Sequence, residues 1–81
     1  MNSSPLELHA LTKLCGDVIG IPAPAPGENF IEVGGDSLMA LRIATLLEER
    51  WGISAEASDV LFAESFAELH AEVTGLPLSA G

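Results

Sequence analysis

Basic and aromatic residues are scarce in this chain of 81 residues, and both shortages restrict what the chain can do. Three lysines and arginines stand against twelve aspartates and glutamates, which gives a formal net charge of −9 at pH 7. Nucleic acids and anionic membranes both attract basic surfaces, so we expect neither as a partner. Tyrosine is absent and aromatic residues make up 5% of the chain, so the core should consist of aliphatic side chains.

Cysteines, histidines and long apolar runs are too few for several other kinds of protein. A single cysteine, Cys15, excludes an internal disulfide, and together with His9 and His70 it does not suffice for a structural zinc site. No apolar run approaches the roughly 18 residues that a membrane span needs, and no signal peptide pattern opens the chain. We therefore expect a cytoplasmic protein with a buried, unreactive Cys15 and with both histidines at the surface or its boundary.

The chain does contain enough apolar residues to fold. Hydrophobic residues make up 48% of it, which excludes a disordered acidic tail. We expect one small domain over residues 1–81, with a core over about 5–75 and a short C-terminal tail. The start at Met1 and the short tail favour a free-standing protein over a domain of a larger one. We expect a monomer.

Hydrophobic spacing predicts an all-α fold without strands. Apolar residues recur every three or four positions in three main helices over about 5–19, 36–51 and 65–74, and in one short helix over 58–62. A long connection over 20–36 carries prolines at alternate positions, and each proline lacks an amide donor and restricts the residue before it. The prediction is a four-helix bundle with a long first loop.

Capping residues mark where the first and last helices should begin. Ser4 is placed to cap the first helix, with Pro5 at its first position and Glu7 completing a capping box. Ser65 and Glu68 form the same pattern before the last helix. The sequence thus predicts that the first helix begins near residue 5 and the last near residue 65.

Several large apolar side chains lie in the first loop or near helix ends, and we assign each of them to the core or to the surface. A connection as long as 20–36 is unusual in a small domain unless its own side chains pin it, and Phe30 and Val33 are the expected pins. We also expect Trp51 in the core. Phe62 lies either in the core, which we favour, or on the contact surface of the second helix. A second apolar stripe on the helix over 36–51, with Leu38, Leu41 and Thr45, should stay partly exposed and form a contact surface.

The sharpest feature is the run Gly34-Gly35-Asp36-Ser37-Leu38 at the junction between the loop and the second helix. Free backbone amides and the helix dipole favour an anion at such a junction by about 0.3–1 kcal/mol. The two glycines leave room for a large group or an enzyme to approach the backbone. Ser37 is therefore suited to carry an anionic substituent, and the alternative interpretation is that Ser37 or Asp36 is only a helix N-cap.

Around this motif the chain resembles the carrier proteins of fatty-acid, polyketide and nonribosomal-peptide synthesis. The matching run is FIEVGGDSL over 30–38, followed by ALR over 40–42, ERWGI over 49–53 and LF over 61–62. The resemblance covers about residues 5–75. The length, the acidity, the long first loop and the order of four helices agree with it.

This resemblance implies a cofactor and the residue that bears it. In that family a phosphopantetheinyl transferase takes 4′-phosphopantetheine from coenzyme A and esterifies the motif serine, which here is Ser37. The arm ends in a thiol that holds acyl or aminoacyl groups as thioesters. The aspartate before the serine, here Asp36, helps place a magnesium ion during the transfer in acyl carrier relatives. The chain would then be a carrier and not an enzyme.

The resemblance also implies partners and a surface for them. Besides the transferase, these are an adenylating or acyltransferring loading enzyme and downstream condensing or tailoring enzymes. They would dock on the side of the second helix nearest the arm, and the expected contacts are Leu38, Leu41, Arg42, Thr45 and Glu48. Glu48 and its neighbour Glu49 either steer basic partners or simply keep the helix hydrated. Leu41 belongs to this surface, and Leu38 lies either there or in the core.

The branch of the family is open on the sequence. Two glycines before the serine and Arg42 after it are typical of peptidyl carriers, whereas Asp36 is common in acyl carriers. We favour a peptidyl or aminoacyl carrier. The alternatives are an acyl carrier of polyketide or fatty-acid synthesis and an unmodified acidic helical module that only binds partners.

A hydrolase is a further alternative, because GDSL over 35–38 is also the signature of a class of lipases and esterases. A nucleophilic serine needs a base within reach and an oxyanion hole. Those enzymes are built on a sheet and keep their base in an Asp-x-x-His motif. Neither Asp17 nor Asp59 has a histidine three residues later, and no strand precedes Ser37, so this alternative is excluded.

Overall fold

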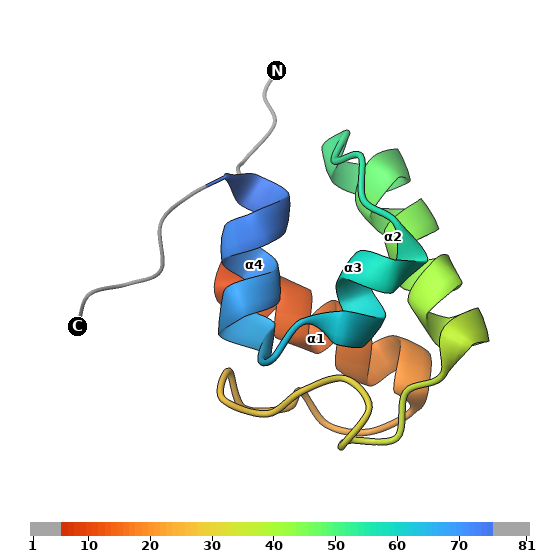
Figure 1. The fold of residues 1–81 in the computed structure, drawn as a ribbon, viewed down its shortest axis with the longest axis vertical. Helices are drawn as coiled ribbons and strands as arrows, with labels where there is room; N and C mark the ends of the chain where they lie inside the picture. Colours follow the sequence, from red (N-terminus) through yellow and green to blue (C-terminus); the bar gives the residue numbers. More distant parts are fainter. Residues whose placement is uncertain (1–5, 76–81) are drawn as a thin grey trace.

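Four helices make up the structure, a computed structural model that describes residues 6–75. They are α1 (Leu8–Ile19), α2 (Ser37–Trp51), α3 (Ala57–Phe62) and α4 (Phe66–Thr74). No strand lies within the described residues, so the predicted all-α bundle with one short helix and a long first loop is confirmed. α2 packs against α1 and α3, and α1 packs against α4 (Figure 1).

One core joins all four helices. Its fully buried side chains are mostly aliphatic, as the composition predicts, but two aromatic rings, Phe30 and Phe66, are the largest of them. Val33 and Trp51 are partly buried and pack against this core. The predicted pinning of the first loop by Phe30 and Val33, and the placement of Trp51, are therefore confirmed.

The start of α1 was predicted too early. The helix begins at Leu8 rather than near residue 5, and Glu7 takes the N-cap position with an extended backbone and no capping bond from its side chain. Leu6 is buried, and its carbonyl accepts a hydrogen bond of 2.7 Å from Nε2 of His70 on α4. An extended approach lets Leu6 reach the core, and this tertiary contact outweighs the local start signal. Ser4 and Pro5 lie outside the described residues.

The loop between α1 and α2 is attached to the start of α4. The backbone N–H groups of Phe66 and Ala67 donate to the carbonyls of Glu28 (2.9 Å) and Pro26 (3.0 Å). These are first-turn amides that have no partner within their own helix. The loop therefore supplies hydrogen-bond acceptors to the first amides of α4. It runs beneath the bundle and connects α1 to α2 (Figure 1).

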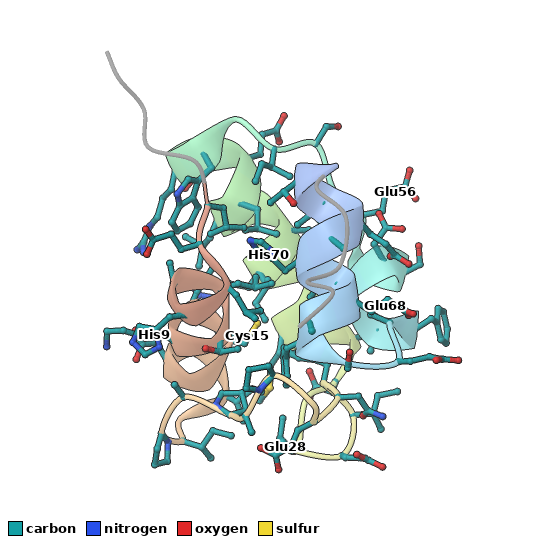
Figure 2. The ribbon with its side chains drawn as sticks, turned by 90° about the vertical axis from the view of Figure 1, so that its left-hand side faces the viewer. His9, Cys15, Glu28, Glu56, Glu68 and His70 are labelled. Atoms are coloured by element: carbon teal, nitrogen blue, oxygen red, sulfur yellow. The ribbon has the colours of Figure 1, made fainter. Side chains whose placement is uncertain are left out.

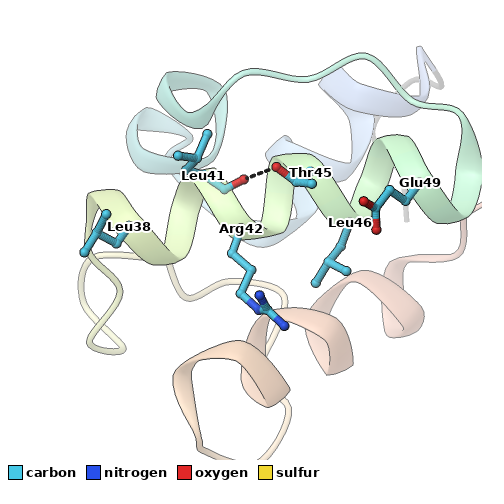
Figure 3. Close-up of a pocket in the computed structure, with 6 residues that line it drawn as sticks. All are labelled: Leu38, Leu41, Arg42, Thr45, Leu46 and Glu49. Carbon is cyan, nitrogen blue, oxygen red and sulfur yellow. Dashed lines mark hydrogen bonds between the residues drawn. The ribbon is translucent and has the colours of Figure 1, made fainter.

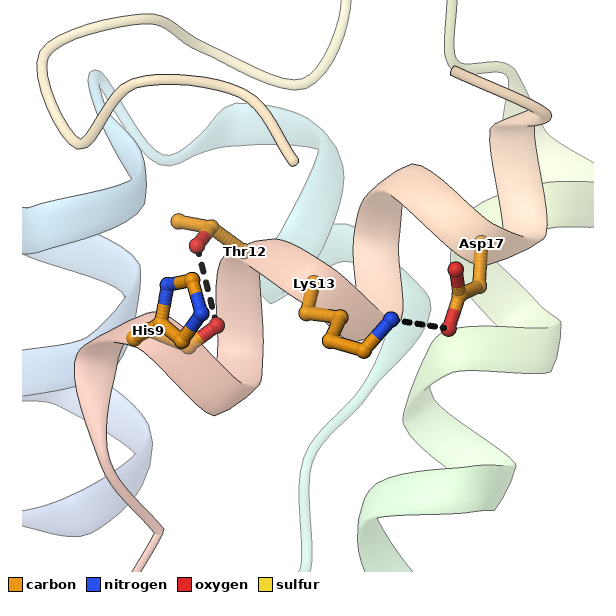
Figure 4. Close-up of polar contacts among 4 residues, drawn as sticks. All are labelled: His9, Thr12, Lys13 and Asp17. Carbon is orange, nitrogen blue, oxygen red and sulfur yellow. Dashed lines mark hydrogen bonds and ion pairs between the residues drawn. The ribbon is translucent and has the colours of Figure 1, made fainter. Parts of the chain in front are cut away.

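Two polar contacts lie along α1 (Figure 4). Thr12 is buried, and its hydroxyl donates to the carbonyl of His9 (3.0 Å). On the exposed side, Lys13 forms an ion pair with Asp17 at 3.8 Å. His9 is exposed and His70 is half-buried, in agreement with the sequence prediction for both. Between residues 6 and 75, none of the helices has the length and apolarity needed to cross a membrane.

Candidate functional site

Ser37 is the first residue of α2, and its side chain is exposed. The capping role belongs to Asp36, whose backbone is extended and whose Oδ1 accepts a hydrogen bond of 2.9 Å from the N–H of Met39. No side chain or backbone group among residues 6–75 bonds to the Ser37 hydroxyl. The two N-cap candidates are thus separated: Asp36 caps the helix, and Ser37 presents an unengaged hydroxyl at its start.

The two glycines before this pair serve the packing of the loop itself. Gly34 has a φ of +105°, in the left-handed region that side chains disfavour. A Cβ on Gly35 would lie 2.3 Å from a ring carbon of Phe30, far inside van der Waals contact. The sequence predicts room here for an outside group, but on this side of Gly35 the room is filled by the Phe30 ring.

Beyond Ser37, α2 turns large apolar side chains to the outside. Leu38 is 78% exposed and Leu41 is 56% exposed, which places both on the surface as a contact stripe requires. Thr45 is exposed on the same stripe, and its hydroxyl donates to the carbonyl of Leu41 (3.0 Å). The open question about Leu38 is settled: it lies outside the core.

Phe62 was predicted in the core and this is wrong, because its side chain is 75% exposed. α3 has six residues, and Val60 is the one that it buries. Residues two apart lie about 200° apart around a helix, so Phe62 must point away from the side that Val60 faces. Phe62 is therefore an exposed aromatic residue at the end of α3.

The predicted partner contacts lie together along α2. A shallow depression of about 440 Å³ is lined by Leu38, Leu41, Arg42, Thr45, Leu46 and Glu49 (Figure 3). A second one, of about 320 Å³, is lined by Leu41, Ala44, Thr45, Glu48, Ala55, Glu56 and Ala57. Leu41 and Thr45 border both. The segment over 55–57 was missed in the sequence because only the packing of α3 on α2 brings it to this side.

Cys15 takes no part in this surface. It is fully buried on α1, and burial raises the pKa of its thiol from 9.0 to about 12. Figure 2 shows it pointing from α1 toward α4, among side chains of the core. The thiol therefore stays protonated and unreactive, as predicted.

Comparisons with known proteins agree with this geometry. The family model described as "Phosphopantetheine attachment site" matches residues 9–73. None of the curated proteins matches the chain.

Solved structures share the fold at low sequence identity. The A-PCP didomain of the carboxylic acid reductase from Segniliparus rugosus, in complex with AMP, has a TM-score of 0.76 at 23% identity and covers 82% of this chain. A docking domain complex of the Pax NRPS, PaxA T1-CDD/PaxB NDD, has a TM-score of 0.71 at 20% identity, over 99% of this chain and 82% of that one. A thiolation-reductase di-domain from an archaeal non-ribosomal peptide synthetase has a TM-score of 0.74 at 22% identity, over 93% of this chain and 16% of that one.

These likenesses differ in what they establish. The chain spans 10% of the length of the carboxylic acid reductase structure, and at these identities the solved structures show the fold alone. The family match is stronger because it extends over most of the chain, across all four helices. Domains of this family are not enzymes: they hold 4′-phosphopantetheine covalently and use it to carry acyl or peptidyl groups. The resemblance seen in the sequence is confirmed, and the chain belongs to the phosphopantetheine attachment (PP-binding) family.

Proposed function

We propose that Ser37 is the residue that carries the 4′-phosphopantetheine arm, and that the chain holds aminoacyl or peptidyl thioesters on it. The observation that carries this proposal is the exposed, unbonded hydroxyl of Ser37 at the first position of α2. Asp36 supports it, because by capping the helix it relieves Ser37 of that task.

The residues at this helix start fit a phosphodiester. The first amides of an α-helix have no partner within the helix, and together with the dipole they favour negative charge. Asp36 engages one of these amides, that of Met39, and its carboxylate would repel the attached phosphate. The charge of Asp36 is thus better explained by the transfer reaction, in which a magnesium ion would offset it, than by the finished product.

The transfer itself is a substitution at phosphorus. The Oγ–P bond of Ser37 forms, the pyrophosphate bond of coenzyme A breaks, and the adenosine bisphosphate half leaves. The hydroxyl proton passes to a base that the transferase supplies. For this chain the requirement is a serine that is exposed and held on a rigid helix, and Ser37 meets both conditions.

The attached arm supplies a thiol, and its chemistry explains the carrier role. A thiol with a pKa near ~8.5 leaves an ester far more readily than an alcohol, so a thioester is ready for transfer to the next enzyme. Tethering raises the concentration of the intermediate at each partner. We propose that partners dock over Leu38, Leu41, Arg42, Thr45 and Glu48, which line adjoining depressions along α2.

The favoured cargo is aminoacyl or peptidyl, with acyl cargo as the alternative. The glycine pair and Arg42 are typical of peptidyl carriers, and the related folds include one described as A-PCP and two from nonribosomal peptide synthetases. An adenylating enzyme would then load the arm, and a condensing or tailoring enzyme would receive the cargo. Loading of the modified chain by an aminoacyl-adenylating enzyme but not by an acyltransferase would support the peptidyl branch, and the reverse result would overturn it.

Intact mass measures the proposed attachment directly. The chain is incubated with coenzyme A, magnesium and a broad-specificity phosphopantetheinyl transferase, beside Ser37→Ala and the control Ser58→Ala, which alters another exposed helical serine. We expect the wild type and Ser58→Ala to gain one phosphopantetheinyl group each and Ser37→Ala to gain none. Modification of Ser37→Ala would refute the assignment, and a folded, unmodified wild type beside a modified control carrier would favour a module that only binds partners.

A further inference from the structure

Next to the proposed attachment site, Gly35 packs closely against Phe30. The three atoms nearest to a Cβ built on Gly35 are all carbons of the Phe30 ring, at 2.3, 2.5 and 2.5 Å. The N–H of Gly35 also donates to the carbonyl of Phe30 (2.9 Å). Ring and backbone are thus in contact two residues before Ser37.

The Phe30 ring is held from the other side. It is 1% exposed and belongs to the core, so it has no open space into which it could retreat. The loop around it is fixed by the hydrogen bonds from Phe66 and Ala67 of α4 to Glu28 and Pro26. The position of Gly35 is therefore set by the core and by α4, not by α2 alone.

We propose that Phe30 and Gly35 are positioning residues for the modification of Ser37. The contact between the ring and Gly35 fixes the position of the backbone that leads into α2. It thereby fixes where the Ser37 hydroxyl lies when the transferase binds. This inference rests on the proposed function, since it concerns the reaction at that serine. Gly35 is thus required for the close contact with the ring, whereas Gly34 is required because its backbone adopts a positive φ.

An alanine at position 35 would force this contact apart. Carbon atoms approach to about 3.5 Å, so ring and backbone must separate by roughly 1 Å. Because the ring is confined, the backbone before Ser37 takes most of the shift. A displacement of that size at a reacting group slows a reaction by up to about 100-fold, so we expect Gly35→Ala to lower kcat of the transfer by about 10- to 100-fold. KM for the chain should change by no more than about twofold, since the docking side chains are untouched.

A double-mutant cycle with Phe30→Leu tests the contact. The readouts are kcat and KM of phosphopantetheine transfer, measured by intact mass well below the melting temperature of the weakest variant. Phe30→Leu should slow the transfer by several-fold because it loosens the entry to α2. Gly35→Ala should then add little in the Phe30→Leu background, because the ring it would strike is gone. Effects that multiply, or the absence of any effect of Gly35→Ala, would overturn the proposal.

Gly34→Ala is the matched control in the same motif. Its cost arises from the positive φ, and the nearest atom to a Cβ there is Cγ2 of Ile19 at 3.9 Å, in ordinary contact. Phe30→Leu should therefore leave the effect of Gly34→Ala unchanged. Relief of both glycine variants by Phe30→Leu would indicate general loosening and would contradict a specific contact.

A second comparison covers the case in which Gly35→Ala does not fold. Phe66→Leu is the same substitution at an equally buried ring on α4, so it serves as a measure of lost packing. At matched loss of melting temperature, Phe30→Leu should lower kcat and Phe66→Leu should not; equal effects would overturn the positioning role. Failure of the proposed function would look different, because the wild-type chain itself would then remain unmodified.

Discussion

At the scale of single residues, two adjacent side chains at the start of α2 differ in role: Asp36 caps the helix, and Ser37 has a free hydroxyl. Ser and Asp are both good N-caps, so the sequence alone leaves open which of Asp36 and Ser37 caps the helix. The hydrogen bond from Met39 N–H to Asp36 places the cap one residue before the helix and leaves Ser37 at its first position. A capping serine would have its oxygen occupied, whereas Ser37 keeps it free for chemistry.

Two substitutions separate the capping role of Asp36 from its proposed role in transfer. Asp36→Ala removes the acceptor and should lower the free energy of unfolding by about 1 kcal/mol, whereas Asp36→Asn keeps an acceptor and should cost little. If the charge also helps place magnesium, both variants should be modified more slowly. Urea unfolding gives the stabilities and intact mass gives the rates. Modification of Asp36→Asn at the wild-type rate would leave Asp36 as a cap alone.

The buried thiol of Cys15 predicts a pH dependence of stability. Its pKa is raised by burial from 9.0 to about 12, so in the folded state the thiol keeps its proton at pH values where the unfolded chain loses it. The contribution of Cys15 is fully present below pH 9 and is lost as the pH rises from 9 toward 12, by about 1.4 kcal/mol per pH unit.

Unfolding by urea at several pH values measures this slope. The chain has no tyrosine and one lysine, Lys13, which is exposed, so few other groups titrate in the same range. Cys15→Ala is the control: it should be less stable at pH 8 and should lose the slope above pH 9. An equally steep slope in Cys15→Ala would assign the effect to other groups.

At the scale of the helix, α2 divides into a buried and an exposed side. Leu47 is fully buried, while Leu41, about 120° away around the same helix, is 56% exposed. Each side could be predicted from spacing, since both stripes repeat at three and four residues. The stripe with Leu38, Leu41 and Thr45 is predicted to be the exposed one, and the exposure of all three side chains confirms this. What spacing does not tell is how α1 and α3 pack against the buried stripe.

A pair of identical substitutions tests this division. Leu41→Asp exchanges an exposed leucine and should change the melting temperature little while slowing reactions with partner enzymes. Leu47→Asp places a carboxylate in the core and should unfold the domain or destabilise it severely. Circular dichroism and partner turnover give the two readouts. A large fall in melting temperature for Leu41→Asp would place that leucine among the packing residues.

The helix ends show where local signals suffice and where they do not. Ser65 caps α4 as predicted, but Glu68 bonds to the N–H of Glu64 and not to that of Ser65, so the capping box is only half formed. A complete one precedes α3, built from Glu56 and Asp59, and it escapes prediction because glutamate is not a usual cap. These caps are local bonds, and the sequence indicates them where the residue types are the usual ones.

Tertiary contacts explain the predictions that were wrong. Leu6 leaves the helical path because the core and His70 hold it, and Phe62 is exposed because Val60 takes the buried side of α3. Gly35 shows the same limit within the candidate site. A glycine at this position suggests open space beside the backbone, but the ring of Phe30, five residues earlier in the chain, occupies that space. Such contacts depend on how the loop folds back, which spacing does not encode.

At the scale of the whole molecule, the negative net charge affects both the stability of the fold and the association with partners. The net charge is −9, and among residues 6–75 the ion pair between Lys13 and Asp17 is the one salt bridge. Most carboxylates therefore repel one another without a compensating partner, which destabilises the compact state. The same excess of negative charge attracts basic partner surfaces over long distances. Folding and association should thus respond to salt in opposite directions.

Added salt should raise the melting temperature of the chain while it slows modification by the transferase. The Debye length falls from about 30 Å at 0.01 M to about 3 Å at 1 M salt, which screens both the internal repulsion and the long-range attraction. We expect kcat/KM of transfer to fall at least about tenfold over this range, in KM rather than in kcat.

Two single-charge variants locate the effect on the surface. Glu48→Gln and Glu72→Gln each remove one exposed carboxylate, the first from the depression along α2 and the second from α4. Both should relieve self-repulsion and raise the melting temperature slightly at low salt. Only Glu48→Gln should lower kcat/KM and flatten its salt dependence, because only Glu48 borders the proposed docking surface. Equal effects of the two variants on kcat/KM would mean that the net charge alone attracts partners. The exposed side of α2 would then have no specific role in recognition.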